Sequence, residues 1–264
     1  MQFIVEGYPA YAYTGGRPFD PDRPAAVLIH GAAFDHSVWQ WQSRYLANQG
    51  FTVLAVDLPG HGRSPGTARR EIAAFARWVA ALVDAACLQR VHMAGHSMGS
   101  LVALETALRH RDRLLTLALL GTAVPMAVSE PFLAAARDRS PAALDMEAVW
   151  GHSRHAQLAT SPVPGVTLLG ASRGLNGRSA PGVLEAGLVA CNDYAVDMEA
   201  VRALDLPTLV IGGKRDQMTP VKAGQALAGA IRGARFATLD AGHSMMSEAP
   251  REVAALLRDH WRAR

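Results

Sequence analysis

Continuous apolar runs alternate with helical patterns along most of this chain. The runs at 26–29, 51–56, 114–120 and 208–211 are typical of strands that are buried on both faces. Between them, apolar residues recur every three or four positions, as along 72–86, which predicts helices that bury one side. Strands that alternate with helices in this way predict a parallel sheet covered by helices on both faces.

The N-terminal end of the chain is predicted to form a hairpin at one edge of the sheet, and the C-terminal end a helix. Residues 2–6 and 8–13 alternate in polarity around a turn that contains Gly and Pro, which predicts an antiparallel hairpin at one edge. A first helix is predicted around 38–46, with Trp41 on its buried side, and one continuous helix is predicted over 247–261. The sheet is therefore expected to be mostly parallel, with one antiparallel edge.

The alternation stops between residues 123 and 204. This segment contains helical patterns at 131–137, 140–150 and 182–191, separated by linkers rich in Ser, Pro and Gly such as 160–165. An insertion of this length between two strands of a sheet predicts a helical cap that lies over the strand ends.

The predicted fold class is therefore α/β, a doubly wound, mostly parallel sheet with an N-terminal antiparallel edge hairpin and an inserted helical cap. Residues 1–122 and 205–264 form the predicted core, and residues 123–204 form the predicted cap. A chain of 264 residues, half of them hydrophobic, is long enough for this arrangement.

Composition and charge argue against several classes of function. The formal net charge is +3 and the arginines are interspersed with acids, as at 69–71, so no basic face for nucleic acid is predicted. No apolar segment approaches the length of a membrane span, and the N-terminus lacks the features of a secretion signal. Cys87 and Cys191 lie far apart, which indicates neither a disulfide framework nor a zinc site. We expect a cytoplasmic monomer or homodimer with a small-molecule substrate, and no nucleic-acid or membrane partner.

The segment 95–99, Gly-His-Ser-Met-Gly, matches the pattern G-x-S-x-G. A predicted strand, 91–94, precedes it, and a helical pattern that begins at Leu101 follows it. This context places the serine on a sharp strand-to-helix turn, with its hydroxyl raised above the sheet and a helix N-terminus behind it. Ser97 is therefore the candidate nucleophile, and side chains at the two glycine positions would collide with the neighbouring strand or helix.

A serine nucleophile needs a general base within hydrogen-bond reach. His243 follows a short predicted strand at 236–239 and precedes the closing helix, so it is expected at the same edge of the sheet as Ser97. The other histidines considered are expected to pack within the sheet (His92 and His96) or to face solvent (His36, His110, His152, His155 and His260).

The base needs an acid that orients it, and the acid is expected at the same edge. Asp216 follows the predicted strand 208–211 and precedes a helix that begins with Pro. Asp57 also ends a strand, but it lies in a tight turn and precedes the serine, and Asp240 is too close in sequence to His243. The predicted catalytic triad is therefore Ser97, Asp216 and His243.

Acyl transfer also needs donors for the oxyanion, preferably backbone N–H groups. The N–H of Met98, directly after the nucleophile, is one candidate, and that of Ala32, in the loop after strand 26–29, is the other. Ala33, Met126 and Trp150 are the candidate substrate-binding residues. No metal ligands are predicted.

Five motifs in order carry a family resemblance: 30–31 (HG), 57–64 (DLPGHGRS), 95–99 (GHSMG), 213–220 (GKRDQMTP) and 242–250 (GHSMMSEAP). Together they resemble the α/β-hydrolase superfamily, in its lid-bearing branch of serine esterases and C–C hydrolases. The resemblance covers almost the whole chain outside the predicted cap. It implies this fold and a triad in the order Ser, Asp, His. Because residue 97 is Ser, dehalogenases and epoxide hydrolases, which carry Asp there, are disfavoured.

The leading hypothesis is a cofactor-independent serine hydrolase that cleaves a small to medium, largely apolar carboxylic ester through an acyl-enzyme. The alternative is a C–C bond hydrolase of the meta-cleavage type, which uses the same triad and needs a cation for the substrate carboxylate, with Arg173 or Arg178 as candidates. A cofactor-free haloperoxidase or perhydrolase, and a ligand receptor on the hydrolase scaffold, are less favoured hypotheses.

Overall fold

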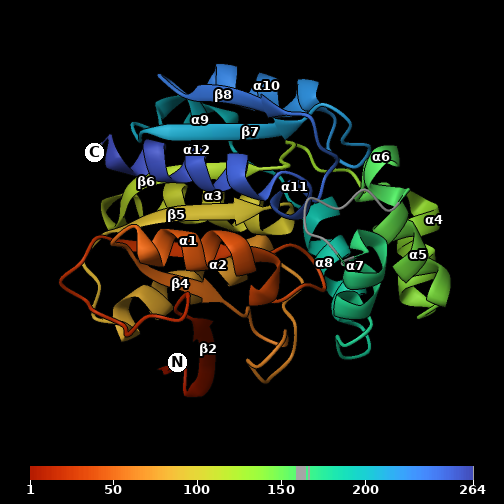
Figure 1. Ribbon diagram of the computed structural model, residues 1–264, viewed down its shortest axis with the longest axis horizontal. Helices are drawn as coiled ribbons and strands as arrows, with labels where there is room; N and C mark the ends of the chain where they lie inside the picture. The colour runs from red at the N-terminus through yellow and green to blue at the C-terminus, as the bar shows by residue number, and fades with distance from the viewer. Residues whose placement is uncertain (159–164, 166, 264) are drawn as a thin grey trace.

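In the computed structural model, which describes residues 1–158, 165 and 167–263, eight strands form one sheet in the order β1-β2-β4-β3-β5-β6-β7-β8 (Figure 1). The strands are β1 (Gln2–Val5), β2 (Tyr8–Tyr13), β3 (Ala25–Ile29), β4 (Thr52–Val56), β5 (Val91–His96), β6 (Leu114–Leu120), β7 (Thr208–Gly213) and β8 (Arg235–Leu239). The β1–β2 and β2–β4 pairs are antiparallel, and the other pairs are parallel. The predicted sheet with its antiparallel edge hairpin is confirmed.

Helices cover both faces of this sheet. One face packs against α2 (Ile72–Ala85), α3 (Met98–Arg109) and α10 (Val221–Ala230), and the other packs against α1 (Gln40–Asn48) and α12 (Pro250–Arg262). The central strands β3 and β4 are buried at every position, as their continuous apolar runs predicted. Within the described chain, no helix combines the length and apolar character that crossing a bilayer requires.

The first predicted helix is correct in place, with Leu46 buried and Val38 and Tyr45 half-buried against the core, but Trp41 was wrongly expected on its buried side. A short 3₁₀ helix, η1 (His36–Trp39), precedes α1, and Trp39 is fully buried while Trp41 is exposed. The polar Gln42 takes a buried position because its Nε2 donates to the carbonyls of Met246, at 3.0 Å, and Pro250, at 3.2 Å. Periodicity assigns buried positions to apolar residues and cannot anticipate a buried amide whose N–H groups find partners far along the chain.

The closing helix was predicted as one continuous helix over 247–261, and this prediction is wrong. The helix divides into α11 (Met245–Glu248) and α12, and Ala249 between them has φ −131° and ψ +57°. The residue before a proline is disfavoured in helical conformation, and Pro250 follows immediately. Pro250 instead takes the first turn of α12, where its missing N–H costs no hydrogen bond.

Between β6 and β7 the chain forms the inserted segment, residues 123–204. Its helices are α4 (Glu130–Arg137), α5 (Pro141–Trp150), α6 (Arg154–Gln157), α7 (Leu168–Asn176), α8 (Val183–Asn192) and α9 (Met198–Ala203). In Figure 1, α4 to α8 lie on the right, beyond one end of the strands. Most of the predicted linker 160–165 lies outside the described residues.

The inserted segment has an apolar cluster of its own, which includes Phe132, Leu133 and Leu188. The three helical patterns predicted from sequence correspond to α4, α5 and α8, whereas α6, α7 and α9 were not predicted. The division of the chain into a core and a cap stays a prediction.

Candidate active site

Ser97 lies on a strained turn between β5 and α3. Its backbone angles are φ +54° and ψ −123°, a region that residues with a side chain rarely adopt. A Cβ at Gly95 would lie 1.9 Å from the carbonyl oxygen of Gly99, and a Cβ at Gly99 would lie 2.5 Å from that of His30. Both glycines are therefore required sterically, as predicted, and the turn holds Ser97 at the carboxyl edge of the sheet.

Asp216 and His243 meet at the same edge. Asp216 follows β7, His243 follows β8, and the Nδ1 of His243 lies 2.8 Å from the Oδ2 of Asp216. Oδ1 of Asp216 accepts the backbone N–H groups of Met218, at 2.9 Å, and Thr219, at 2.8 Å. The hydroxyl of Thr219 donates to Oδ2 at 2.7 Å. These bonds fix the carboxylate so that it can orient the imidazole.

The two groups shift each other's pKa. Burial favours the neutral imidazole, but the charge of Asp216 and its hydrogen bond outweigh burial, so the pKa of His243 lies above its ordinary value of 6.5. Burial likewise favours the neutral carboxyl, but His243 and the donors from Thr219 hold the pKa of Asp216 below 3.8. The pair therefore favours a negative Asp216 and stabilises a positive charge on His243.

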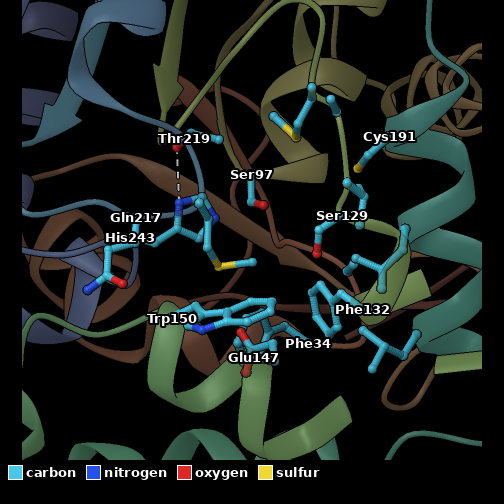
Figure 2. Close-up of a pocket in the computed structure, with 17 residues that line it drawn as sticks. Phe34, Ser97, Ser129, Phe132, Glu147, Trp150, Cys191, Gln217, Thr219 and His243 are labelled. Atoms are coloured by element: carbon cyan, nitrogen blue, oxygen red, sulfur yellow. Dashed lines mark hydrogen bonds between the residues drawn. The ribbon is translucent and has the colours of Figure 1, made fainter. Parts of the chain in front are cut away.

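Ser97 and His243 face one cavity of about 320 Å³ (Figure 2). The Nε2 of His243 is buried and has no hydrogen-bond partner among the residues that the structure describes. His96 packs beneath this ring and its Nε2 lies 2.9 Å from the carbonyl oxygen of His243. The predicted nucleophile, base and acid are thus brought together, with the free ring nitrogen on the cavity side.

The two predicted oxyanion donors also lie at this site. Ala32 lines the cavity, and Met98 is the first residue of α3, where backbone N–H groups have no partner within the helix. Neither N–H donates to another group in the described part of the chain. A Cβ at Gly187, in α8, would lie 2.8 Å from the Cβ of Ala32, so the inserted segment packs directly on this loop.

Two of the three predicted substrate-binding residues lie at the cavity. Met126 and Trp150 line the cavity, but Ala33 is not among the residues described there. Ala33 is buried, and its carbonyl accepts a hydrogen bond of 2.6 Å from Ser179. Phe34, the next residue, takes the place on the cavity wall.

Several lining residues were not identified from the sequence. Core loops and the inserted segment supply the apolar walls, which include Phe34, Val128, Phe132, Leu184, Leu188 and Met218. The polar positions that were missed are Ser129, Glu147, Gln217 and Thr219. Thr219 lies three residues after Asp216, so the search for the acid could have found it. Glu147 gave no signal, because a charged residue in a short helix is expected to face solvent.

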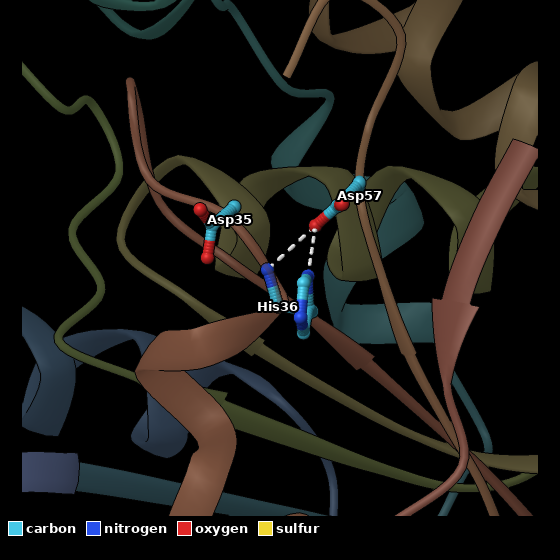
Figure 3. A group of neighbouring side chains, drawn as sticks. All are labelled: Asp35, His36 and Asp57. Carbon is cyan, nitrogen blue, oxygen red and sulfur yellow. Dashed lines mark hydrogen bonds and ion pairs between the residues drawn. The ribbon is translucent and has the colours of Figure 1, made fainter. Parts of the chain in front are cut away.

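A second histidine–aspartate pair lies in the loops after β3 and β4 (Figure 3). The Nδ1 of His36 lies 2.8 Å from the Oδ1 of Asp57, which also accepts the backbone N–H of His36, and Oδ2 accepts that of Arg63. Asp35 accepts the N–H of Ser37 and pairs with Arg178. One ligand atom from each of Asp35, His36 and Asp57 lies within 4.8 Å of the others, but these oxygens already accept hydrogen bonds.

Two other buried histidines depart from their predicted places at the surface. The Nε2 of His260 lies 3.1 Å from the carbonyl oxygen of Leu117, in β6. The Nδ1 of His152 lies 2.8 Å from the carbonyl oxygen of Ala148, in α5. Each ring finds a backbone partner in the interior, which is how buried polar side chains are tolerated.

Comparison with known proteins agrees with this architecture. The family model of the alpha/beta hydrolase fold matches residues 24–250. The chain is 30% identical to a pimeloyl-[acyl-carrier protein] methyl ester esterase of Neisseria meningitidis strain H44/76, over 90% of this chain and 93% of that protein. It is 32% identical to the protein of the same name from Aromatoleum aromaticum, over 90% of this chain and 98% of that protein.

Among solved structures, the chain resembles the enol-lactonase of Burkholderia xenovorans LB400. The TM-score is 0.87 at 25% identity, and the match covers 98% of this chain and 99% of that one. With the matched family model and these relatives, the chain belongs to the alpha/beta hydrolase fold family.

Proposed function

We propose that this protein is a serine hydrolase that cleaves carboxylic esters. The Oγ of Ser97 attacks the ester carbonyl while the Nε2 of His243 takes the hydroxyl proton. The resulting oxyanion is held by the N–H groups of Ala32 and Met98. His243 then gives the proton to the leaving alcohol, and the acyl group stays on Ser97.

The second half of the reaction repeats these steps with water. Water attacks the acyl-enzyme as His243 takes its proton, the oxyanion forms again, and the proton returns to Ser97 as the acid leaves. Asp216 orients the imidazole and stabilises its positive charge in both halves. Apart from the ester and water, every group in these steps is a side chain or a backbone N–H of this chain, so we expect the reaction to need no cofactor.

One observation carries this proposal: Ser97 sits on a strained turn and faces the same cavity as the unpartnered Nε2 of His243, whose other nitrogen is bound to Asp216. A nucleophile, a base and an orienting acid in this order are what acyl transfer requires.

The cavity supports a small to medium, largely apolar substrate. Its volume of about 320 Å³ is at the small end of ligand pockets, and its walls are mostly apolar. The named relatives are a methyl ester esterase and an enol-lactonase, and both names describe cleavage of an ester bond. We propose esters in which a short or medium acyl chain is joined to a small alcohol.

The C–C hydrolase alternative finds less support. It needs a cation near the substrate carboxylate, and neither Arg173 nor Arg178 is among the residues described on the cavity wall. Arg173 pairs with Asp145, and Arg178 pairs with Asp35, both with exposed guanidinium groups.

Labelling with a fluorophosphonate, combined with turnover of p-nitrophenyl acetate and butyrate, tests the proposal. We expect the label on Ser97, and we expect Ser97→Ala to lower kcat by about 10⁶-fold because the nucleophile is removed. Ser247→Ala is the control, since among the described residues its hydroxyl donates to the carbonyl of Ser244 alone, and Ser247 is not among those that line this cavity. Unchanged turnover in Ser97→Ala, or a label on another residue, would refute the assignment.

A further inference from the structure

One carboxyl group lies in the mostly apolar wall that the inserted segment contributes to the cavity, where Ser129 is a second polar position. Glu147, in α5, is the only acidic residue among the described lining residues. Figure 2 shows Glu147 and Trp150 on the same helix, on the side of the cavity opposite the label of Ser97. Glu147 plays no part in the reaction described above.

The structure holds Glu147 from one side only. Its Oε2 accepts a hydrogen bond of 3.1 Å from the hydroxyl of Ser172 and another from the Nδ2 of Asn176, both in α7. Oε1 accepts no hydrogen bond from a residue in the described part of the chain. Because Glu147 lines the cavity and is buried, a donor that enters the cavity and binds the free oxygen forms a hydrogen bond in a largely desolvated site, where such bonds are favourable.

The charge of Glu147 changes near neutral pH. Burial raises its pKa to about 7, although Ser172, the positive charge of His243 and Asn176 act in the opposite direction. The elements around it also carry His152 after α5, Glu248 in α11, Arg173 in α7, which pairs with Asp145, and Arg137 in α4, which pairs with Glu130. Protonated Glu147 is therefore favoured below about pH 7 and negative Glu147 above it.

We propose that Glu147 determines specificity by selecting esters whose non-reacting end carries a hydrogen-bond donor, best a protonated amine, and by rejecting esters that carry a carboxylate there. This inference rests on the proposed esterase function and adds the polar group that the substrate presents. A protonated amine forms a charge-assisted hydrogen bond with Glu147, whereas a second carboxylate meets a like charge in a buried site.

Three butyrate esters of equal size test the proposal. They are 4-methylpentyl butyrate, 3-(dimethylamino)propyl butyrate and 3-carboxypropyl butyrate, which end in an isopropyl group, a protonated amine and a carboxylate. A second set carries the same ends on the acyl side: methyl 5-methylhexanoate, methyl 4-(dimethylamino)butanoate and monomethyl glutarate. In each set, kcat/KM is divided by that of the isopropyl compound, so that the titration of His243, common to all three, cancels.

In the set whose variable end reaches Glu147, we expect the amine ratio at pH 8 to fall by about tenfold or more in Glu147→Gln. The carboxylate ratio is expected to rise in the same variant. In the unmodified enzyme, the amine ratio should rise and the carboxylate ratio should fall as pH increases through about 7, because Glu147 becomes negative. Neither ratio should depend on pH in Glu147→Gln.

Glu105→Gln is the matched control. Glu105 is also a buried glutamate, but it pairs with Arg109 and Tyr194 and does not lie among the described cavity residues. This control should leave all ratios unchanged, and the pH series on the unmodified enzyme gives an answer even if Glu147→Gln does not fold. Ratios that are independent of pH in both sets, or equal in the enzyme and in Glu147→Gln, would overturn the role of Glu147. Absence of turnover with all six esters would instead refute the esterase function.

Discussion

Two histidine–aspartate pairs lie at the same edge of this sheet, and only one of them belongs to a candidate active site. Asp57 directly follows β4 and Asp216 follows β7, which run parallel, so both carboxylates emerge at the carboxyl ends of strands. In both pairs the Nδ1 of the histidine lies 2.8 Å from the carboxylate, and both carboxylates accept backbone N–H groups. Neither the distance nor the hydrogen bonds distinguish them.

The two pairs differ in what surrounds the histidine. The ring of His36 packs against Tyr11, at 4.9 Å between centroids, and Tyr13, at 5.8 Å, in strand β2 of the antiparallel edge hairpin. The ring of His243 is buried, and its Nε2 faces a cavity that Ser97 also lines. A histidine–aspartate pair therefore indicates catalysis only where the second ring nitrogen lies near a nucleophile and a cavity for the substrate. Elsewhere, such a pair stabilises the loops that carry it.

The largest effect that would separate the pairs is on the rate. Asp216→Asn should lower kcat by about 10⁴-fold, since an amide neither selects the catalytic tautomer of His243 nor stabilises its positive charge. Steady-state hydrolysis of p-nitrophenyl butyrate measures it, and thermal unfolding confirms that the variant is folded. A folded Asp216→Asn enzyme of normal kcat would break the comparison, because the two pairs would then be equivalent.

The corresponding change in the other pair should act on stability. Asp57 accepts hydrogen bonds from His36 and Arg63, and a Cβ at Gly62 would lie 2.4 Å from its Oδ2. Asp57→Asn places N–H against N–H in this network, so the free energy of unfolding should fall by about 3 kcal/mol. Urea denaturation measures the loss, and kcat of the folded fraction should stay near normal. If kcat instead falls as far as in Asp216→Asn, the pair around Asp57 has a role in catalysis.

The smallest effect is on the pH dependence of kcat/KM. His243 acts as a base in its neutral form, and its pKa lies above 6.5, so kcat/KM should fall about tenfold per pH unit below that pKa. In Asp216→Asn the fall of the residual kcat/KM at acidic pH (the acid limb of the profile) should shift to lower pH. The charge that raises the pKa of His243 is gone in that variant. Glu147→Gln should keep the acid limb, because it leaves His243 intact. This result would show that the limb arises from His243 and not from Glu147, whose pKa is also near neutral. If the acid limb disappears in Glu147→Gln and keeps its pH in Asp216→Asn, it arises from Glu147 instead of His243.

Much of the site could be predicted because its residues are constrained locally. Ser97 lies between two glycines at positions where the backbone contacts leave no room for a side chain. Asp216 follows the apolar strand β7, and His243 follows the short strand β8. Parallel strands bring their carboxyl ends to one edge, so the position of each residue after its strand was enough to place the three together. Met126 and Trp150 were also predicted on the cavity wall, where the structure has them.

Other features depend on partners that are distant in the sequence. His260 looked like a solvent-facing residue of a helix, but its ring is buried with a partner in β6. Trp41 was expected inside, yet Gln42 is buried because two carbonyls around α11 and α12 accept from it. His36 was expected at the surface and is bound by an aspartate 21 positions later in the chain.

The sequence by itself determined the alternation of strands and helices, the turn that carries Ser97, and the edge at which Asp216 and His243 arrive. These follow from hydrophobic periodicity and from steric requirements within a few residues. Only the tertiary structure decided which residues of the inserted segment line the cavity beside Ser97 and His243. It also decided that Glu147 is buried there with one oxygen hydrogen-bonded and the other free. Burial of a charge depends on elements packed from far along the chain, and no local pattern records it.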